Sequence, residues 1–177
     1  MSAVDLYGEA RRALAHPDAA NLLAPLGLDP ETESAIGLAT VRRESDGLYV
    51  PDVDGKFVAA ILPVMQDDDL IDLVAVDIAN PERWRRRTGL GAVLGEANTV
   101  ALFGEPLLVH PGPIDWLRAG GDGVAVLECT PTVRGLLNSI EGGLDVIGNL
   151  DFAEALERRL TEPIRRPKIY IRQPRPR

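Results

Sequence analysis

The sequence predicts an α/β protein in which an N-terminal helical hairpin and an antiparallel meander precede a mostly parallel sheet flanked by helices. Three observations predict this class. Apolar residues recur at helical spacing before residue 27, at strand spacing from residue 37, and in short strands that alternate with helical segments after Gly104. Strands that alternate with helices build parallel sheets through right-handed crossovers. With 45% apolar and 26% charged positions among 177 residues, the chain has the composition of a globular protein with a substantial core.

The N-terminal half predicts two helices followed by three strands. Segments 4–15 and 19–26 have helical periodicity, and His16-Pro17-Asp18 separates them because proline restricts the residue before it. The expected strands are 37–43, 56–64 and 70–78, with acidic and glycine-bearing turns between them. Segment 81–95 is rich in arginine and glycine and leads through a short helical or looped piece to Phe103.

The C-terminal half predicts strands and helices in alternation. The expected strands are 106–110, 123–127, 144–148 and 168–172, and the expected helices are 113–119, 131–140 and 151–160. Pro113 and Pro131 stand in first helical turns, which accept proline, and Asn149 or Leu150 stands at the cap before Asp151. We therefore divide the chain into a mixed α+β subdomain (1–104), an α/β subdomain (105–172) and a basic tail (173–177).

Charge is distributed unevenly along the chain. The net charge is −8, but residues 1–154 carry −14 and residues 155–177 carry +6. An acidic body disfavours binding of duplex DNA over a broad surface, whereas a local basic segment can contact phosphates. The C-terminal basic residues have three possible roles. They could bind nucleic acid, bind an acidic partner, or keep an edge strand from pairing with another chain. These are Arg165, Arg166, Lys168, Arg172, Arg175 and Arg177.

Composition excludes several kinds of site. Cys129 is the only cysteine, so no internal disulfide forms, and with His16 and His110 it cannot supply a zinc-finger ligand set. We expect an inert thiol there. The longest apolar run, 57–65, is too short to span a bilayer, and the N-terminus lacks the layout of a signal peptide. The sequence therefore predicts a cytoplasmic protein with no membrane partner, in which any metal would be bound by carboxylates.

Candidate site residues follow the strands of the C-terminal half, because ligands of open parallel sheets gather at the carboxyl ends of the strands. His110, Glu128 and Asp151 occupy such positions, and Asp115 lies in the first turn of the first crossover helix. Converging carboxylates there would hold a divalent cation for phosphoryl transfer. The simpler alternatives are a histidine that is hydrogen-bonded to a neighbouring loop, and aspartates that are stabilised by a helix dipole.

Two stretches of the C-terminal half resemble the toprim domain of topoisomerases and of bacterial and phage DNA primases. Residues 107–120, LLVHPGPIDWLRAG, with strand 124–127, are similar to the opening of that domain. In the family a strand ends in Glu-Gly, an aspartate follows on the helix, and an aliphatic-Ala-Gly step leads to the second strand. Residues 149–155, NLDFAEA, are similar to the family signature D-x-D-x-A-G.

The N-terminal half is similar to the mixed subdomain that precedes toprim in a primase core. Residues 60–64 and 70–76 resemble its paired strands, and residues 84–89, WRRRTG, with 93–95 resemble its basic, lysine-bearing stretch. The resemblance thus covers about 19–172 and implies a primase-core-like subdomain followed by a toprim-like, Rossmann-like subdomain.

The chain departs from the family at its catalytic positions. The catalytic glutamate of the family falls on His110, its following glycine on Pro111 or Gly112, and the first aspartate of the D-x-D pair on Asn149. Of the carboxylates that bind magnesium in the family, the chain retains Asp151 together with Asp115. Asp151 is therefore the candidate metal ligand. The zinc-binding domain that accompanies such primases does not occur in this sequence. The resemblance therefore implies a toprim fold with a degenerate catalytic centre.

Arg83, Arg85, Arg86 and Arg87 form the densest basic cluster of the body, and Trp84 lies within it. The resemblance implies that this stretch contacts template or nucleotide phosphates. On a strand, Arg85 and Arg87 would share one face, and Trp84 would either stack on a base or pack in the core. The alternative is ion pairing of the arginines with the acidic turn at 67–69.

The favoured function is a nucleic-acid-binding or replication-accessory module of a phage or mobile element that needs no cofactor. Its expected partners are single-stranded DNA or a primer-template, and a replication protein such as a helicase or a primase subunit. Two alternatives stay open. One is a Mg²⁺- or Mn²⁺-dependent nucleotidyltransferase or nuclease that uses Asp115, Glu128, Asp151 and His110. The other is a protein interaction scaffold that does not bind nucleic acid.

Overall fold

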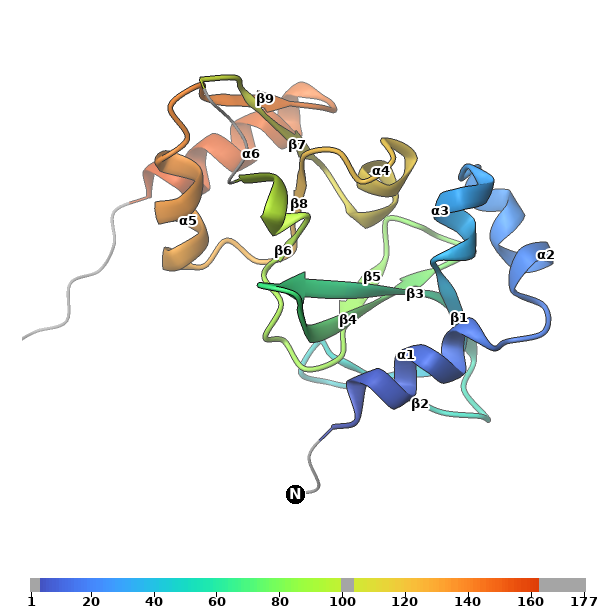
Figure 1. The fold of residues 1–177 in the computed structure, drawn as a ribbon. Helices are drawn as coiled ribbons and strands as arrows, with labels where there is room; N and C mark the ends of the chain where they lie inside the picture. Colours follow the sequence, from blue (N-terminus) through green and yellow to red (C-terminus); the bar gives the residue numbers. More distant parts are fainter. Residues whose placement is uncertain (1–3, 100–103, 163–177) are drawn as a thin grey trace, which may run out of the picture.

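The N-terminal half forms a five-stranded antiparallel sheet in the order β2-β1-β3-β4-β5 (Figure 1). The computed structural model describes residues 4–99 and 104–162. The sheet strands are β1 (Gly37–Arg43), β2 (Tyr49–Pro51), β3 (Phe57–Gln66), β4 (Asp69–Asp77) and β5 (Trp84–Arg86). They follow α1 (Leu6–Leu14), α2 (Ala19–Leu23), the 3₁₀ turn η1 (Ala24–Leu26) and α3 (Pro30–Ser34).

The expected antiparallel meander is confirmed. The two expected helical segments are present but do not pack together as a hairpin, because Ala13 of α1 belongs to the core on one face of the sheet and Leu23 of α2 to the core on the other. Strand β1 has the predicted bounds, and β3 and β4 begin and end within two residues of theirs. The turn between β3 and β4 consists of Asp67 and Asp68, which both have positive φ and so match the right-handed twist of the hairpin. α3, β2 and β5 are additional elements of three to five residues, too short to produce a periodic pattern.

Both faces of the antiparallel sheet are buried. On β3, Ala59 and Ile61 contribute to the core beneath α1, whereas Ala60, Leu62 and Val64 point into a second core on the opposite face. β4 alternates in the same way. A strand that is covered on both faces needs apolar residues at consecutive positions, which explains the long apolar run at 57–65.

The C-terminal half contributes a four-stranded mixed sheet in the order β6-β8-β7-β9. Its strands are β6 (Val93–Leu94), β7 (Leu107–His110), β8 (Val124–Val126) and β9 (Leu144–Val146). β7 pairs in parallel with β8 and β9, whereas β6 runs antiparallel to β8. The sheet is therefore mixed, because β6 adds an antiparallel edge that we did not predict. The expected strand 168–172 and the tail 173–177 lie outside the described residues.

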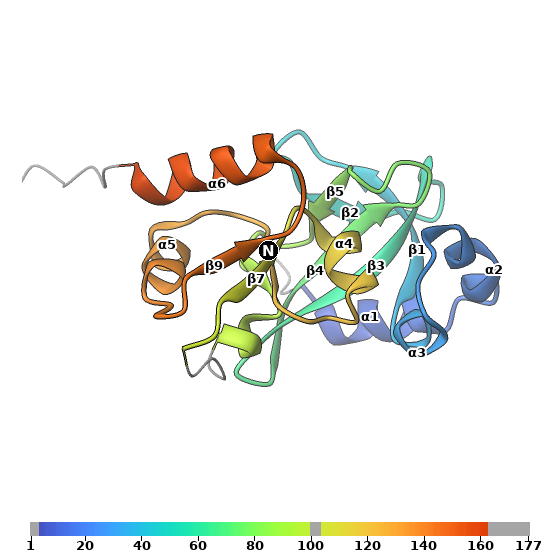
Figure 2. The same ribbon diagram turned by 90° about the horizontal axis from the view of Figure 1, so that it is seen from above.

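Four helical segments accompany this sheet: η2 (Glu96–Thr99), α4 (Pro113–Arg118), α5 (Pro131–Asn138) and α6 (Leu150–Thr161). Pro113 and Pro131 occupy first helical positions as predicted. The Asn149 side chain accepts a hydrogen bond from the backbone N–H of Phe152 at 2.9 Å and so caps α6. Figure 2 shows α5 and α6 on the side of the mixed sheet that faces away from the antiparallel sheet.

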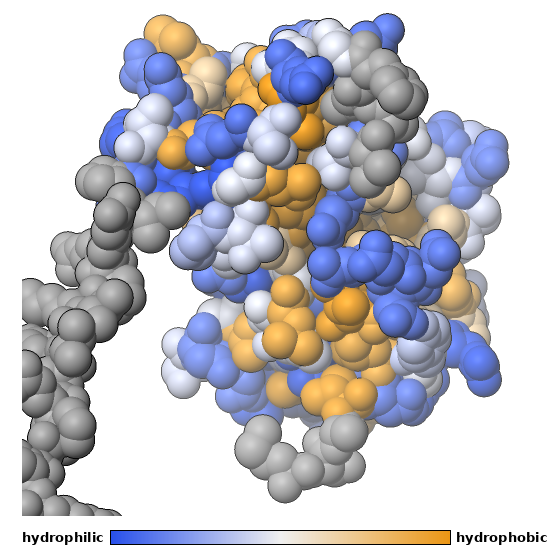
Figure 3. Space-filling model, turned by 60° about the vertical axis from the view of Figure 1, so that its left-hand side comes forward, coloured by the Kyte–Doolittle hydropathy of each residue, from blue (hydrophilic) through white to orange (hydrophobic). Residues whose placement is uncertain are grey.

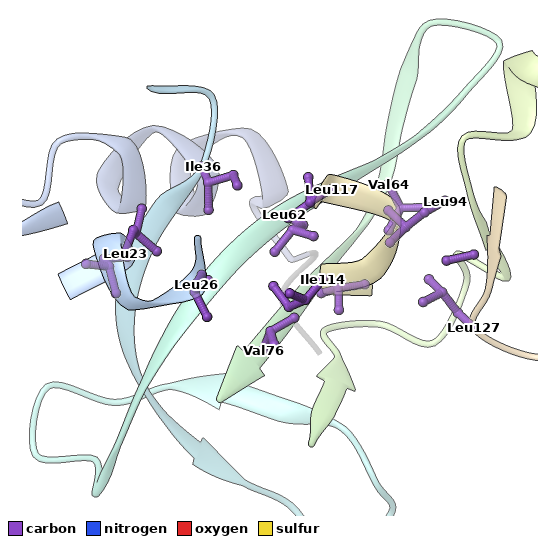
Figure 4. Close-up of a cluster of buried hydrophobic side chains, with 14 residues drawn as sticks. Leu23, Leu26, Ile36, Leu62, Val64, Val76, Leu94, Ile114, Leu117 and Leu127 are labelled. Carbon is purple, nitrogen blue, oxygen red and sulfur yellow. The ribbon is translucent and has the colours of Figure 1, made fainter. Parts of the chain in front are cut away.

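Helix α4 lies between the two sheets and joins them through one hydrophobic core (Figure 4). Ile114 and Leu117 of α4 pack against Leu62 and Val76 of the antiparallel sheet, and the same cluster contains Leu94 of β6. A second cluster, with α5 and α6, covers the other face of the mixed sheet. We predicted a subdomain boundary between residues 104 and 105. Strand β6 lies before that boundary in the sequence, yet it pairs with β8 and so belongs to the mixed sheet.

The buried carboxylate of Asp72 organises the loop that leads from one sheet to the other. Asp72 is fully buried, and its Oδ1 accepts N–H hydrogen bonds from Leu73, Arg87 and Thr88 at 2.8, 3.1 and 2.8 Å. Its Oδ2 accepts the N–H of Gly91 at 3.0 Å. Glycine is required at residue 91, because a Cβ atom there would lie 2.8 Å from both Asp72 Cβ and Val64 Cγ1.

Hydrophilic residues cover much of the face drawn in Figure 3, and apolar residues gather between them in patches. None of the helices in the described ranges has the length and apolar character that crossing a membrane requires.

Replacing Asp72 with asparagine should lower the free energy of unfolding by about 2–3 kcal/mol. The amide removes the charge and directs its NH₂ group toward at least one buried N–H donor. Urea denaturation measures the change. Asp68→Asn is the matched control, because this exposed turn residue tolerates either side chain and should change stability by less than about 0.5 kcal/mol. Equal effects of the two substitutions would contradict the role of Asp72.

Candidate functional site

A cleft of about 520 Å³ opens at the carboxyl ends of β7 and β9. Three turns form its walls: the segment that enters β5, the β7–α4 turn and the β9–α6 turn. The lining residues are Pro81, Glu82, Trp84, Pro111, Gly112, Ile114, Asp115, Arg118, Gly148, Asn149 and Phe152. The cleft thus occupies the edge at which the parallel strands were expected to present a ligand site.

The β9–α6 turn places an amide and an aromatic ring in this cleft. Gly148 has a φ of 134°, a conformation that side chains rarely adopt, and it turns the chain directly into the Asn149 cap of α6. Phe152 follows in the first turn of α6 and packs against the core that α5 and α6 cover. Because capping engages the Asn149 side-chain oxygen, its NH₂ group is the part that is available for a ligand.

Helix α4 contributes opposite charges to the cleft. Asp115 Oδ1 lies 3.7 Å from Arg118 Nη1, and both side chains are nearly half exposed. Arg118 Nε donates to the backbone carbonyl of Leu26 at 3.0 Å, which ties α4 to η1 and orients the guanidinium. Asp115 is the one predicted carboxylate that lines the cleft, and Arg118 and Glu82 join it there although we did not predict them as site residues.

His110 is part of the packing of the sheet. It is 4% exposed, and its Nε2 lies 2.9 Å from the carbonyl oxygen of Asp122, in the loop before β8. A carbonyl oxygen only accepts hydrogen bonds, so Nε2 carries the proton. This geometry corresponds to the strand-end histidine bonded to a neighbouring loop. His110 does not line the cleft, although the next residue, Pro111, does.

The other two predicted carboxylates lie outside the cleft lining. Glu128 Oε2 forms an ion pair with Arg86 Nη2 at 2.7 Å, at the far side of β8. Asp151 is exposed in the first turn of α6, which corresponds to the helix-dipole alternative. No group of three or more His, Cys, Asp or Glu side chains that could hold a metal ion occurs within 4–99 and 104–162.

The predicted arginine cluster divides into two pairs. Arg87 forms a two-bond ion pair with Glu9 of α1, at 2.8 and 3.0 Å, and the hydrogen bonds from Glu9 raise the pKa of Arg87. Arg86 donates to Glu128 and to the carbonyls of Gly89 and Gly91. These two arginines hold the β5–β6 loop, and their partners are Glu9 and Glu128 rather than the acidic turn at 67–69.

Arg83 and Arg85 make fewer interactions. Arg83 is exposed, and Arg85 Nη1 donates to the carbonyl of Trp84 at 2.7 Å. Neither forms an ion pair with another described residue. Trp84, between them in the sequence, is half-buried: it packs against the shared core, as one alternative expected, and it also lines the cleft. The basic residues of the C-terminal tail lie outside the described residues.

Cys129 follows β8 and is half-buried rather than buried. Burial raises the pKa of its thiol, and the nearby Arg159 and Arg134 only partly oppose that effect. The thiol is therefore protonated at neutral pH, as expected for an unreactive cysteine.

A scan of protein-family models, a search of curated proteins and a search of solved structures each produced no match for this chain. The similarity to toprim therefore rests on the residues quoted above and stays a prediction.

The division of the arginine cluster predicts two different substitution effects. Arg87→Ala leaves Glu9 without its partner and should reduce the free energy of unfolding by about 2 kcal/mol or more. Arg85→Ala should change it by less than about 0.5 kcal/mol. Thermal and urea denaturation compare the two variants. A stable Arg87→Ala protein would show that the arginine is not structural.

Proposed function

We propose that this chain binds single-stranded nucleic acid as a catalytically degenerate, toprim-like primase-core module that serves replication of a phage or mobile element. The observation that carries the proposal is Trp84, which lines the cleft. Its sequence neighbours Arg83 and Arg85 do not line the cleft, and they have no ion-pair partner among the described residues. Proteins that bind single strands combine cations that follow the phosphates with aromatic rings on which bases stack.

The dimensions and lining of the cleft support this function. Its volume of about 520 Å³ lies in the usual range for small-ligand sites and accommodates a nucleotide. Trp84 and Phe152 provide aromatic surface, and Arg118 provides a cation that is already oriented by Leu26. The amide of Asn149 and the carboxylate of Asp115 provide polar groups that can recognise base edges.

His110 and Asn149 each have a structural role, which supports a chain without the catalytic chemistry of the toprim family. His110, at the position of the family's glutamate, bonds the Asp122 carbonyl, and Asn149, at the first D-x-D position, caps α6. Both side chains serve the fold at positions where the family uses carboxylates. Asp115 and Glu82 are the acidic residues of the cleft lining.

The charge distribution favours single strands over duplex DNA. The two free arginines form a short basic segment on a chain whose first 154 residues carry a net charge of −14. A flexible strand can follow such a segment and keep its other phosphates away from the acidic surface. A duplex presents two rigid rows of phosphates and would meet that surface.

One observation favours a second candidate, a metal-dependent enzyme. Asp115 and Glu82 line the same cleft, so an incoming phosphate together with these carboxylates would provide oxygen ligands for Mg²⁺ or Mn²⁺. That ligand set differs from the predicted one, because Glu128 and Asp151 do not line the cleft.

The test is the affinity for a dye-labelled 12-residue oligothymidylate, measured by fluorescence anisotropy in EDTA at several salt concentrations. The Arg83→Ala/Arg85→Ala variant should bind about tenfold more weakly than the unchanged protein. The slope of log affinity against log salt should fall by about 1.4, because two phosphate contacts are lost. The matched control is Arg11→Ala/Arg12→Ala, which removes the same charge from α1 and should leave the slope unchanged.

Two results would contradict the proposal: unchanged binding of the Arg83→Ala/Arg85→Ala variant, or equal weakening of both variants. Adding Mg²⁺ or Mn²⁺ separates the candidates. Turnover of a primed template or cleavage of the oligonucleotide that depends on Asp115 and Glu82 would support the enzyme instead.

A further inference from the structure

A second cavity, of about 360 Å³, lies between α1 and the β1–β2 edge of the antiparallel sheet. It shares no lining residue with the cleft at the carboxyl ends of β7 and β9. Its interior is mainly apolar, with Ala13 of α1, Ala39 of β1 and Ile61 of β3 among its walls. Arg12, His16 and Val53 stand on the more exposed parts of its lining.

The charged residues around this cavity are not equally available to a ligand. Glu9 is paired with Arg87, and Asp52 accepts a hydrogen bond from Arg42 at 3.2 Å. Both carboxylates of the lining therefore have cationic partners within the protein. Arg12 has no carboxylate partner among the residues that the structure describes. The available charge at this cavity is therefore positive, although the body of the protein is acidic.

Tyr49 adds a buried polar group to the lining. It is 1% exposed and lines the cavity. Burial, reinforced by the charge of Glu9, raises the pKa of Tyr49 far above its usual range, so the hydroxyl keeps its proton and can donate it.

We propose that this cavity binds a small organic acid whose apolar body fills the space between α1 and the sheet and whose carboxylate pairs with Arg12. Arg12 recognises the anionic end because the other charges of the lining are already paired. The apolar walls hold the body of the ligand, and Tyr49 donates a hydrogen bond. The site is independent of the nucleic-acid cleft, so either can fail without the other.

The test is an NMR titration of the full chain with phenylacetate, with amide shifts of Thr40, Tyr49 and Val53 as the readout. Phenylacetamide and phenethylamine serve as the neutral and cationic analogues. Phenylacetate should produce saturable shifts at these amides and bind at least about tenfold more tightly than either analogue, because a hydrogen bond to a charged group is the stronger one.

Two substitutions on the same helix separate a specific contact from general charge. Arg12→Gln should weaken phenylacetate binding about tenfold, whereas Arg11→Gln, which removes the same charge outside the cavity lining, should not change it. Ala39→Leu should abolish the shifts by filling the cavity, with circular dichroism to verify that the variant folds. The proposal is wrong if phenylacetate produces no saturable shift, if phenylacetamide binds as tightly, or if the two arginine variants behave alike.

Discussion

The arrangement of the two sheets depends on one buried carboxylate, that of Asp72. Four backbone N–H groups donate to it, and three of them belong to the segment 87–91 that connects β5 with β6. Buried backbone N–H groups of a loop need hydrogen-bond acceptors. Here the carboxylate of Asp72 accepts these hydrogen bonds, in place of the carbonyl groups that a neighbouring strand would offer. β6 then begins two residues after Gly91 and enters the mixed sheet, so this loop determines where the second half of the chain starts.

The four arginines at 83–87 differ in how they are held by the rest of the fold. Arg86 ends β5 and Arg87 begins the loop that Asp72 holds, and each has a carboxylate partner elsewhere in the chain. Arg83 precedes β5 and Arg85 lies within it, and neither residue lines the cleft. One basic run in the sequence thus contains two arginines with ion-pair partners and two that have none among the residues that the structure describes. Charge alone cannot distinguish them, because their partners lie 42 and 78 residues away.

Local patterns predict this fold well where the signal is periodic. Strands β1, β3 and β4, helices α4 to α6 and the Asn149 cap follow from apolar spacing and from capping chemistry. The two-residue strand β6 and the ion pair between Glu9 and Arg87 could not be predicted, because they depend on contacts that only the folded chain brings together. Asp115 of α4 lines the strand-end cleft, whereas Glu128 and Asp151, which were expected there because they follow strands in the sequence, do not.

The proposed binding of a nucleic-acid strand in the cleft that Trp84 lines can be measured by hydrogen–deuterium exchange of the full chain, with and without a 12-residue oligothymidylate in EDTA. We predict slower exchange in 82–86 and in 148–152, where the cleft walls lie, and little change at Thr88 and Gly91, whose N–H groups already bond Asp72. Exchange that is unchanged in both cleft segments, or slowed only around α1 and β2, would contradict the account.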